Sequence, residues 1–263
     1  MPKMFVVPLD RSELAERALP VAAALARRWD AQVLPLMVTT AGGRADAEHY
    51  LQSAAATLGP IAAAERLVTS DRPAEVILDA GRDLDSVVCM TTHGRGRLRW
   101  AVLGSVAEAV LGASENPVVL VGRRCPADWP GTASELQICF DGTLGSEYVI
   151  DTACEWARAL GCSVSIARVI HPLDVVDPQR PEHDAGPARD LVQERGFDPR
   201  LDVIRSRDPA FALADLAVEH SAALVAMTTS ARAGVSRLAL GSITMGVVGM
   251  APCPLLVVRG FAD

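Results

Sequence analysis

Two stretches of this chain, 137 residues apart, repeat one pattern: VVCMTTHGRGRLRWAVLGS at 87–105 and LVAMTTSARAGVSRLALGS at 224–242. Each begins with a short apolar run, which indicates a buried β-strand. Each ends with a Gly-Ser pair ahead of a second apolar segment, which is typical of the start of a helix. The segment between them predicts a loop at the carboxyl end of the strand.

The repeat extends over most of the chain. MFVVPLD, which ends at Asp10, matches ELQICFD, which ends at Asp141, and two further pairs match: AQVLPLMV (31–38) with CSVSIARV (162–169), and NPVVLVG (116–122) with CPLLVVR (253–259). Two copies of one unit of about 125 residues account for these matches. The stretch between them, GRRCPADWPGTAS, contains Pro and Gly and has no periodicity. We expect a first domain at 1–122, a linker at 123–134 and a second domain at 135–263.

Strands and helices alternate within each copy. Apolar runs in the first copy predict strands at 4–9, 32–38, 64–68, 86–90 and 117–121. Apolar periodicity predicts helices from Ala15 to Trp29, at 44–57, from Pro73 to about Arg82, and from about Gly104. This order predicts an α/β fold with two tandem, doubly wound, Rossmann-like domains, each a five-stranded parallel sheet. Right-handed crossovers favour the strand order 3-2-1-4-5 in each domain.

Such a sheet has one switch point, between its first and fourth strands, and ligands bind beyond the carboxyl ends of the strands there. The residues after Met90 are therefore candidates. Gly94 and Gly96 let the backbone approach a ligand closely. Gly104-Ser105 opens a helix, whose free N–H groups and dipole favour an anion such as a phosphate.

The residues after the first strand are the second set of candidates. Asp10 could accept hydrogen bonds from a ribose or a base edge, while Pro8 and Val38 could line an apolar slot. Plainer interpretations stay open, because the Gly-rich loop could be only a tight turn and Asp10 could simply cap the next helix. The other polar residues of the loop could lack a catalytic role or form a solvated surface: His93, Arg95, Arg97 and Arg99.

Composition narrows the classes of function. The 263 residues are 50% hydrophobic and 22% charged, and their formal net charge is −7. An acidic chain lacks the positive field that non-specific binding to nucleic acid needs, and anionic membranes are equally poor partners. No stretch approaches the roughly 20 apolar residues of a membrane span, and the N-terminus lacks a signal-peptide pattern. The six cysteines form no CxxC pair or zinc-type cluster. We therefore expect a cytoplasmic protein with buried thiols and no metal site.

With these features the sequence resembles the universal stress protein family in a tandem form, and the resemblance covers nearly the whole chain. The nucleotide motif of that family is G-x2-G-x9-G-[S/T]; here Thr91 replaces the first glycine, while Gly94 and Gly104-Ser105 match the rest. Pro8-x-Asp10 and Val38 match its adenine- and ribose-side elements. The resemblance implies that Met90 and Thr91 lie near an adenosine. It also implies that four residues hold phosphates: Gly94, Gly104, Ser105 and Val106.

The second half departs further from the motif. Asp141 corresponds to Asp10 and Val169 to Val38, so the acidic residue and the apolar wall residue are both retained. Cys139 replaces Pro8. Met227 is retained, Thr228 and Ala231 stand where the two early glycines would be, and Gly241-Ser242 is intact. We expect weaker nucleotide binding in this half, or none.

Catalytic signatures are scarce. The chain has no G-x4-G-K-[S/T] loop and no G-x-S-x-G elbow. Asp141-Gly142-Thr143 hints at a phosphoryl acceptor, without an evident second carboxylate for Mg²⁺. The sequence therefore favours a stress-response regulatory module that binds ATP, with or without Mg²⁺, and does not catalyse strongly. A slow ATPase or phosphotransferase and a nucleotide-free scaffold remain the alternatives.

Assembly follows from the last strand of each copy. Val118–Val121 and Leu255–Val258 should lie at sheet edges, and exposed apolar edges promote aggregation unless they are covered. Two copies in one chain can cover each other's edges as an intrachain pseudo-dimer. A homodimer of whole chains stays an open possibility.

Overall fold

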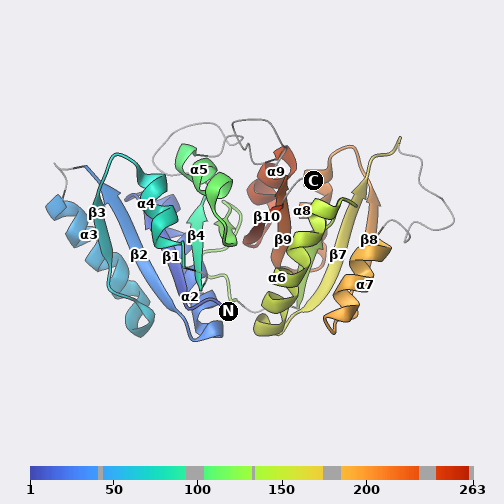
Figure 1. Cartoon of the computed structure of the whole chain (residues 1–263), viewed down its shortest axis with the longest axis horizontal. Helices are drawn as coiled ribbons and strands as arrows, with labels where there is room; N and C mark the ends of the chain where they lie inside the picture. The colour runs from blue at the N-terminus through green and yellow to red at the C-terminus, as the bar shows by residue number, and fades with distance from the viewer. Residues whose placement is uncertain are drawn as a thin grey trace.

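The computed structural model describes residues 1–40, 44–83, 85–92, 104–131, 134–173, 185–230 and 241–260. Within these ranges the strands form one ten-stranded sheet, in the order β3-β2-β1-β4-β5-β10-β9-β6-β7-β8. Figure 1 shows this sheet extending along the longest axis of the molecule, from β3 on the left to β8 on the right. Each half of the chain thus supplies one half of a continuous sheet.

The first half contains β1 (Met4–Leu9), β2 (Gln32–Thr39), β3 (Arg66–Thr69), β4 (Ser86–Thr91) and β5 (Val118–Val121). The second half contains β6 (Glu135–Cys139), β7 (Ser163–Ile170), β8 (Arg200–Arg205), β9 (Ala222–Ser230) and β10 (Leu255–Gly260). Neighbouring strands within each half pair in parallel. The predicted order, 3-2-1-4-5 in each half, is confirmed.

The two half-sheets join through their fifth strands. β5 pairs antiparallel with β10, with Leu120 opposite Leu255 and Val118 opposite Val257. An apolar strand at a sheet edge exposes a row of unpaired backbone groups. Because the fifth strands pair with each other, each half covers the edge of the other.

Helices cover both faces of the sheet. One face carries α1 (Glu13–Glu16), α2 (Ala18–Trp29), α3 (Arg44–Leu58), α6 (Leu144–Leu160) and α7 (Gly186–Glu194), and a 3-10 turn (Gly59–Ile61) follows α3. The opposite face carries α4 (Pro73–Ala80), α5 (Ser105–Ala113), α8 (Pro209–Glu219) and α9 (Ser242–Met250). Side chains of β1 alternate accordingly, since Phe5 and Val7 belong to one buried cluster and Val6 to the other.

The helix expected between Ala15 and Trp29 is in fact two helices. α1 ends at Glu16 and α2 begins at Ala18. Pro20 has no N–H to bond with the carbonyl of Glu16, so the helical hydrogen-bond ladder is interrupted there. Other boundaries shift by a few residues: β3 begins at Arg66, and α4 ends at Ala80.

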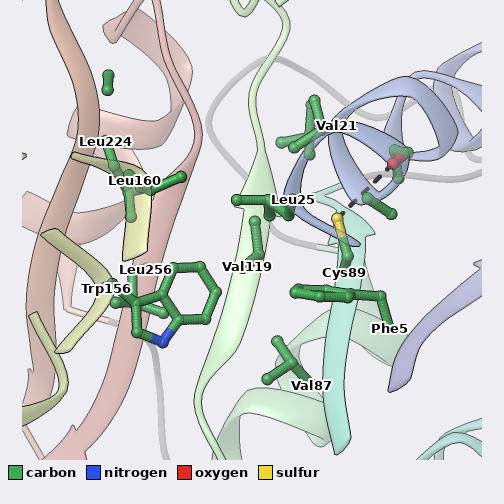
Figure 2. Close-up of a cluster of buried hydrophobic side chains, with 14 of the residues drawn as sticks. Phe5, Val21, Leu25, Val87, Cys89, Val119, Trp156, Leu160, Leu224 and Leu256 are labelled. Carbon is green, nitrogen blue, oxygen red and sulfur yellow. Dashed lines mark hydrogen bonds between the residues drawn. The ribbon is translucent and has the colours of Figure 1, made fainter. Parts of the chain in front are cut away.

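An aromatic cluster packs where the two halves meet. The ring centroids of Trp29 in α2 and Trp156 in α6 are 4.8 Å apart, and that of Phe5 lies 6.0 Å from Trp29 and 6.3 Å from Trp156. Figure 2 shows Phe5 and Leu25 of the first half on one side of this core, with Trp156 and Leu256 of the second half on the other. The hydrophobic core on this face is therefore continuous across the junction.

The segment between the halves packs against both of them. Trp129 is buried, and its indole N–H donates a 3.1 Å hydrogen bond to the carbonyl of Ala223 in β9. Cys125 is also buried, and its carbonyl accepts a hydrogen bond from the guanidinium of Arg17. Among the helices that the structure describes, none has both the length and the apolar character to cross a bilayer.

Candidate functional site

The carboxyl ends of β1 and β4 part at the predicted switch point. The ladder between these strands runs from Met4 opposite Ser86 only as far as Val6 opposite Val88. β1 continues to Leu9, where it still pairs with β2, and β4 continues to Thr91. The first and fourth strands of the first half thus separate over their last three residues. In open α/β sheets, ligands bind in the crevice at the carboxyl ends of strands that separate in this way.

Pro8 and Val38, the two predicted wall residues, share one face of the sheet with Met90. Val6, Leu36 and Met90 belong to a single buried cluster, beneath α4 and α5. Side chains alternate along a strand, so Pro8, two residues after Val6, and Val38, two residues after Leu36, lie on the same face. Pro8 and Val38 are half-buried, whereas Met90 is buried. These three side chains therefore lie on one face of the sheet, near the carboxyl ends of neighbouring strands.

The start of α5 lies on the same face of the sheet as Met90. The backbone N–H of Gly104 donates a 2.8 Å hydrogen bond to the carbonyl of Thr92, which ties the helix to the end of β4. Gly104 occupies the N-cap position with extended backbone and so supplies no side-chain cap of its own. Ser105 is exposed in the first turn, and Val106 packs against the same cluster as Met90. A helix start with a glycine at the N-cap and an exposed hydroxyl in its first turn suits an anion.

Asp10 organises the turn after β1. Its Oδ1 accepts two hydrogen bonds from Ser12, one from the backbone N–H at 3.0 Å and one from the hydroxyl at 2.6 Å. Ser12 is the residue that caps α1, since its hydroxyl accepts a 3.1 Å bond from the N–H of Ala15. The alternative of Asp10 as the cap is therefore replaced by an indirect role, in which Asp10 orients the capping serine.

The second half repeats this turn. Oδ1 of Asp141 accepts hydrogen bonds from the backbone N–H of Thr143 at 2.9 Å and from its hydroxyl at 2.6 Å. Thr143 in turn caps α6 by accepting a bond from Ser146. Burial works to raise the pKa of Asp141, but the hydrogen bonds from Thr143 and Ser146 outweigh it and hold this pKa below its ordinary value. Both halves therefore present a fixed carboxylate at the corresponding position.

The corresponding face of the second half carries different residues. Cys139 takes the place of Pro8, and it is buried in one cluster with Met227 and the partly buried Val169. Beneath it, the fully buried Gln137 donates to the carbonyl of Leu213 at 3.0 Å and to Cys139 Sγ at 3.8 Å. Burial raises the pKa of the Cys139 thiol to about 12, so this group is uncharged at neutral pH.

The remaining candidates of the second half lie at the ends of β9 and α9. Thr228 is half-buried, and its Cβ would lie 3.3 Å from a β-carbon placed on Gly260 in the adjacent strand. Gly241 is an extended N-cap that supplies no side-chain cap of its own, and Ser242 is exposed. The geometry of this helix start therefore matches that of α5.

Thr91 lies on a different face from Met90, the other residue that the resemblance places near the adenosine. It is buried at the end of β4, and strand alternation places it on the face opposite Met90. Several other candidates lie outside the described residues, and so does the loop that carries them: His93, Gly94, Arg95, Gly96, Arg97, Arg99 and Ala231.

Two residues beside these sites escaped the sequence analysis. Tyr50 of α3 donates a 2.9 Å hydrogen bond to Glu16 Oε1, next to the Asp10 turn. Its helical spacing from Ala47 and Leu51 places it on the inner face, but nothing in that pattern indicates a polar role. Gln137 carried a usable signal, because it is a polar residue inside the apolar run ELQIC. A surface groove of about 840 Å³ between α2, α3 and residues 127–130 contains none of the predicted site residues.

No group of three or more His, Cys, Asp or Glu residues in the described part of the chain is placed to hold a metal ion. Comparison with known families gives a clear match, in which the model of the universal stress protein family covers residues 1–122 and 136–259. Comparison with curated protein sequences gave no match.

Two solved structures that match nearly the whole chain share its fold. A universal stress protein from Archaeoglobus fulgidus DSM 4304 is 17% identical, with a TM-score of 0.71, and the match covers 98% of this chain and 99% of that one. A functionally unknown protein from Pseudomonas aeruginosa PAO1 is 15% identical, with a TM-score of 0.69 and coverage of 98% and 93%. A shorter universal stress protein from Archaeoglobus fulgidus, in complex with dAMP, is 17% identical, with a TM-score of 0.38 and coverage of 49% and 98%.

Proposed function

Because the chain belongs to the universal stress protein family through both of its halves, we propose that it binds an adenine nucleotide, with ATP as the expected ligand. The observation that carries this proposal is the position of three apolar side chains, Pro8, Val38 and Met90, on the face that also carries the start of α5. An apolar slot next to a helix N-terminus suits a flat base that is joined to a charged phosphate chain.

Each part of the nucleotide has a matching group. The base would lie between Pro8, Val38 and Met90, where half-buried and buried side chains exclude water. The carboxylate of Asp10, oriented by Ser12, would accept hydrogen bonds from ribose hydroxyls or from the edge of the base. The phosphates would contact the first turn of α5 at Gly104, Ser105 and Val106, and by the family resemblance Gly94 as well.

Mg²⁺ would neutralise part of the phosphate charge if the ligand is Mg-ATP. The role we propose is binding and regulation, in which ATP shifts the protein between two states or between partners. The Ser12 hydroxyl donates to the Asp10 carboxylate and at the same time caps α1, so we assign this pair a structural role and propose no fast hydrolysis by it.

We propose that the second half binds nucleotide more weakly or not at all. Cys139 and Gln137 make the floor of its slot more polar than Pro8 and Val6 make that of the first half. The start of α9 has the same geometry as the start of α5. The capacity to bind an anion there would therefore not differ between the two halves. The difference between them would come from the slot.

Two further assignments complete the proposal. We place the first domain at 1–122, the connecting segment at 123–134 and the second domain at 135–263. All six cysteines are free and buried, which suits a reducing compartment such as the cytoplasm.

Thermal unfolding with and without nucleotide tests the proposal. A ligand that binds the native state stabilises it by mass action, by about 2.7 kcal/mol at a concentration 100 times its Kd. We expect millimolar Mg-ATP to raise the melting temperature, and mass spectrometry to identify an adenine nucleotide in the purified protein. No shift with ATP, AMP or dAMP would remove the binding proposal and leave an interaction scaffold. A shift together with measurable phosphate release would replace the regulatory module by a slow ATPase.

A further inference from the structure

A surface groove, which we call the α2 groove, runs along one stripe of α2 in the helix layer that also holds α3 and α6. Its volume is about 840 Å³, and it is open to solvent. The end of α3 contributes Thr57 and Leu58 to one side. The floor consists of small or apolar side chains that repeat every three or four residues along the helix: Leu19, Pro20, Ala23 and Ala24.

The segment that connects the two halves forms the other side of the α2 groove. The carbonyl of Cys125 accepts a hydrogen bond from the guanidinium of Arg17, at the start of α2. Farther along, a β-carbon on Gly131 would lie 3.0 Å from that of Ala24. The segment therefore follows α2 for about two turns, with Trp129 lining the groove.

The second half bridges the corresponding stripe with its own side chains. In the alignment of the two copies, Asp151 takes the place of Pro20, and Arg158 takes the place of Arg27. Arg195, which follows α7, forms an ion pair with Asp151, and its carbonyl accepts a 2.8 Å hydrogen bond from Arg158. Pro20 has no charge with which to form such an ion pair. The groove is therefore a feature of the first half and not a consequence of the repeated fold.

The charged residues of the α2 groove are separated along the helix. Glu16 lies at one end, just before α2, whereas Arg27 and Arg28 lie in its last turn. Asp128 belongs to the connecting segment at the side. Both arginines are exposed, and neither side chain forms an ion pair or hydrogen bond with another residue in the described part of the chain. One end of the groove thus offers two positive charges to a partner.

An amphipathic helix suits this arrangement. Such helices bind in grooves through apolar side chains at i, i+3, i+4 and i+7, and small residues on the floor let two helix axes approach closely. A helix antiparallel to α2 would place its first turn near Arg27 and Arg28 and its last turn near Glu16. The helix dipole favours acidic residues in a first turn and basic residues in a last turn. The charges of such a helix would therefore complement those of the groove.

We propose that the α2 groove is a docking site for an amphipathic helix of a partner protein. The helix lies antiparallel to α2, with acidic residues in its first turn, basic residues in its last turn and an apolar stripe on the floor. The residues of the proposed nucleotide slot belong to the opposite face of the sheet, so this inference does not rest on the proposed function.

The probe is a fluorescein-labelled synthetic peptide of about 12 residues, which spans about 18 Å as a helix. It carries two glutamates in its first turn, leucines at i, i+3, i+4 and i+7, and two lysines in its last turn. We expect saturable binding to the whole chain by fluorescence anisotropy. A second peptide, in which the glutamates and lysines are exchanged, should bind about tenfold more weakly, because each exposed ion pair contributes only modestly.

A double variant, Arg27→Glu with Arg28→Glu, tests the position of the helix. It should weaken binding of the first peptide about tenfold and remove the preference for that peptide over the second. The matched control is Arg123→Glu with Arg124→Glu, which makes the same change of charge at an exposed pair outside the groove. The control should leave both affinities unchanged.

Three results would overturn the proposal: neither peptide binds, both bind the wild-type chain equally well, or the two double variants behave alike. The comparison of the peptides on the wild-type chain needs no variant to fold. Sedimentation tests a second copy of the chain as the occupant. A wild-type dimer that dissociates in the Arg27→Glu, Arg28→Glu variant would place that copy in the groove and replace the partner helix.

Discussion

Gly122, which follows β5, packs directly against Val248 of α9 in the other half of the molecule. A β-carbon on Gly122 would lie 1.9 Å from the carbonyl oxygen of Val248. Real β-carbons do not approach a backbone atom so closely, so this contact exists only because residue 122 is glycine. The helix that begins with Gly241-Ser242 is thereby seated on the end of a strand from the first half.

Replacing Gly122 by alanine should destabilise the whole molecule. The added methyl group meets backbone, which cannot rotate away as a side chain can, so the two halves must move apart. Overpacking of this kind costs about 1–3 kcal/mol and occasionally more. We expect Gly122→Ala to lower the free energy of unfolding in urea by that amount or more.

Gly249→Ala is the control for this prediction. Gly249 lies in α9 itself, and a β-carbon there would meet nothing within 4 Å. Alanine is favoured over glycine in a helix by about 1 kcal/mol, so this variant should be as stable as the wild type or more stable. Equal stability of the two variants would show that the contact between Gly122 and Val248 does not matter to the junction.

The start of α5 offers the most direct test of the phosphate position. Gly104 has extended backbone (φ −63°, ψ 143°), which valine can adopt, so Gly104→Val should still fold. The branched side chain would crowd the amides of the first turn and should abolish the rise in melting temperature with Mg-ATP. The change of N-cap residue should cost about 1 kcal/mol in the absence of nucleotide.

The equivalent change in the second half, Gly241→Val, is the matched control. A β-carbon on Gly241 would meet nothing within 4 Å, and the backbone there is also extended. We expect the Mg-ATP shift to survive in this variant, because the first half carries the binding. A shift that survives in Gly104→Val but disappears in Gly241→Val would move the site to the second half.

The sheet order, and the shared face of Pro8 and Val38, could be predicted because both follow from local patterns. The apolar runs that end at Leu9 and Met90 fixed which strands are central, and alternation then placed Pro8 and Val38. Pro20 also carried a signal, since its missing N–H divides one expected helix into α1 and α2.

The contacts that hold the site and the junction could not be predicted in this way. The indole of Trp129 bonds to the carbonyl of Ala223, 94 residues away, and Tyr50 reaches Glu16 across two helices. Such pairs depend on how the helices and connecting segments pack against the sheet in the tertiary structure. Neither composition nor periodicity contains that distance information.

The Asp141 turn predicts how stability depends on pH. The pKa of Asp141 is held below its ordinary value of 3.8 in the folded chain, so the unfolded chain takes up the proton first as the pH falls. The stabilisation is thus fully present above about pH 5 and is lost as the pH falls through the folded-state pKa.

Asp141→Asn should remove this contribution. We expect the variant to be less stable than the wild type at pH 7, by an amount on the order of the 1 kcal/mol that a cap interaction contributes. The gap should narrow in urea titrations from pH 5 to pH 3. Thr143→Val, which lacks the donor hydroxyl, should flatten the pH dependence as well. A gap that stays constant down to pH 3 would mean that the charge of Asp141 contributes nothing to folding.

The aromatic contact between Trp29 and Trp156 should make a large contribution to the stability of the junction. Trp156 is 3% exposed, and its ring lies against both Trp29 and Phe5. Truncation of a buried tryptophan to alanine typically costs 3–5 kcal/mol. We expect Trp156→Ala to lower the free energy of unfolding by about that much.

Trp129→Phe separates this packing from the hydrogen bond of the connecting segment. Phenylalanine keeps most of the buried ring but cannot donate to the carbonyl of Ala223, so the loss should be near 1 kcal/mol. Urea unfolding followed by circular dichroism measures both variants without relying on tryptophan emission. If Trp156→Ala costs no more than Trp129→Phe, then pairing of β5 with β10 holds the halves together and the aromatic cluster merely fills space between them.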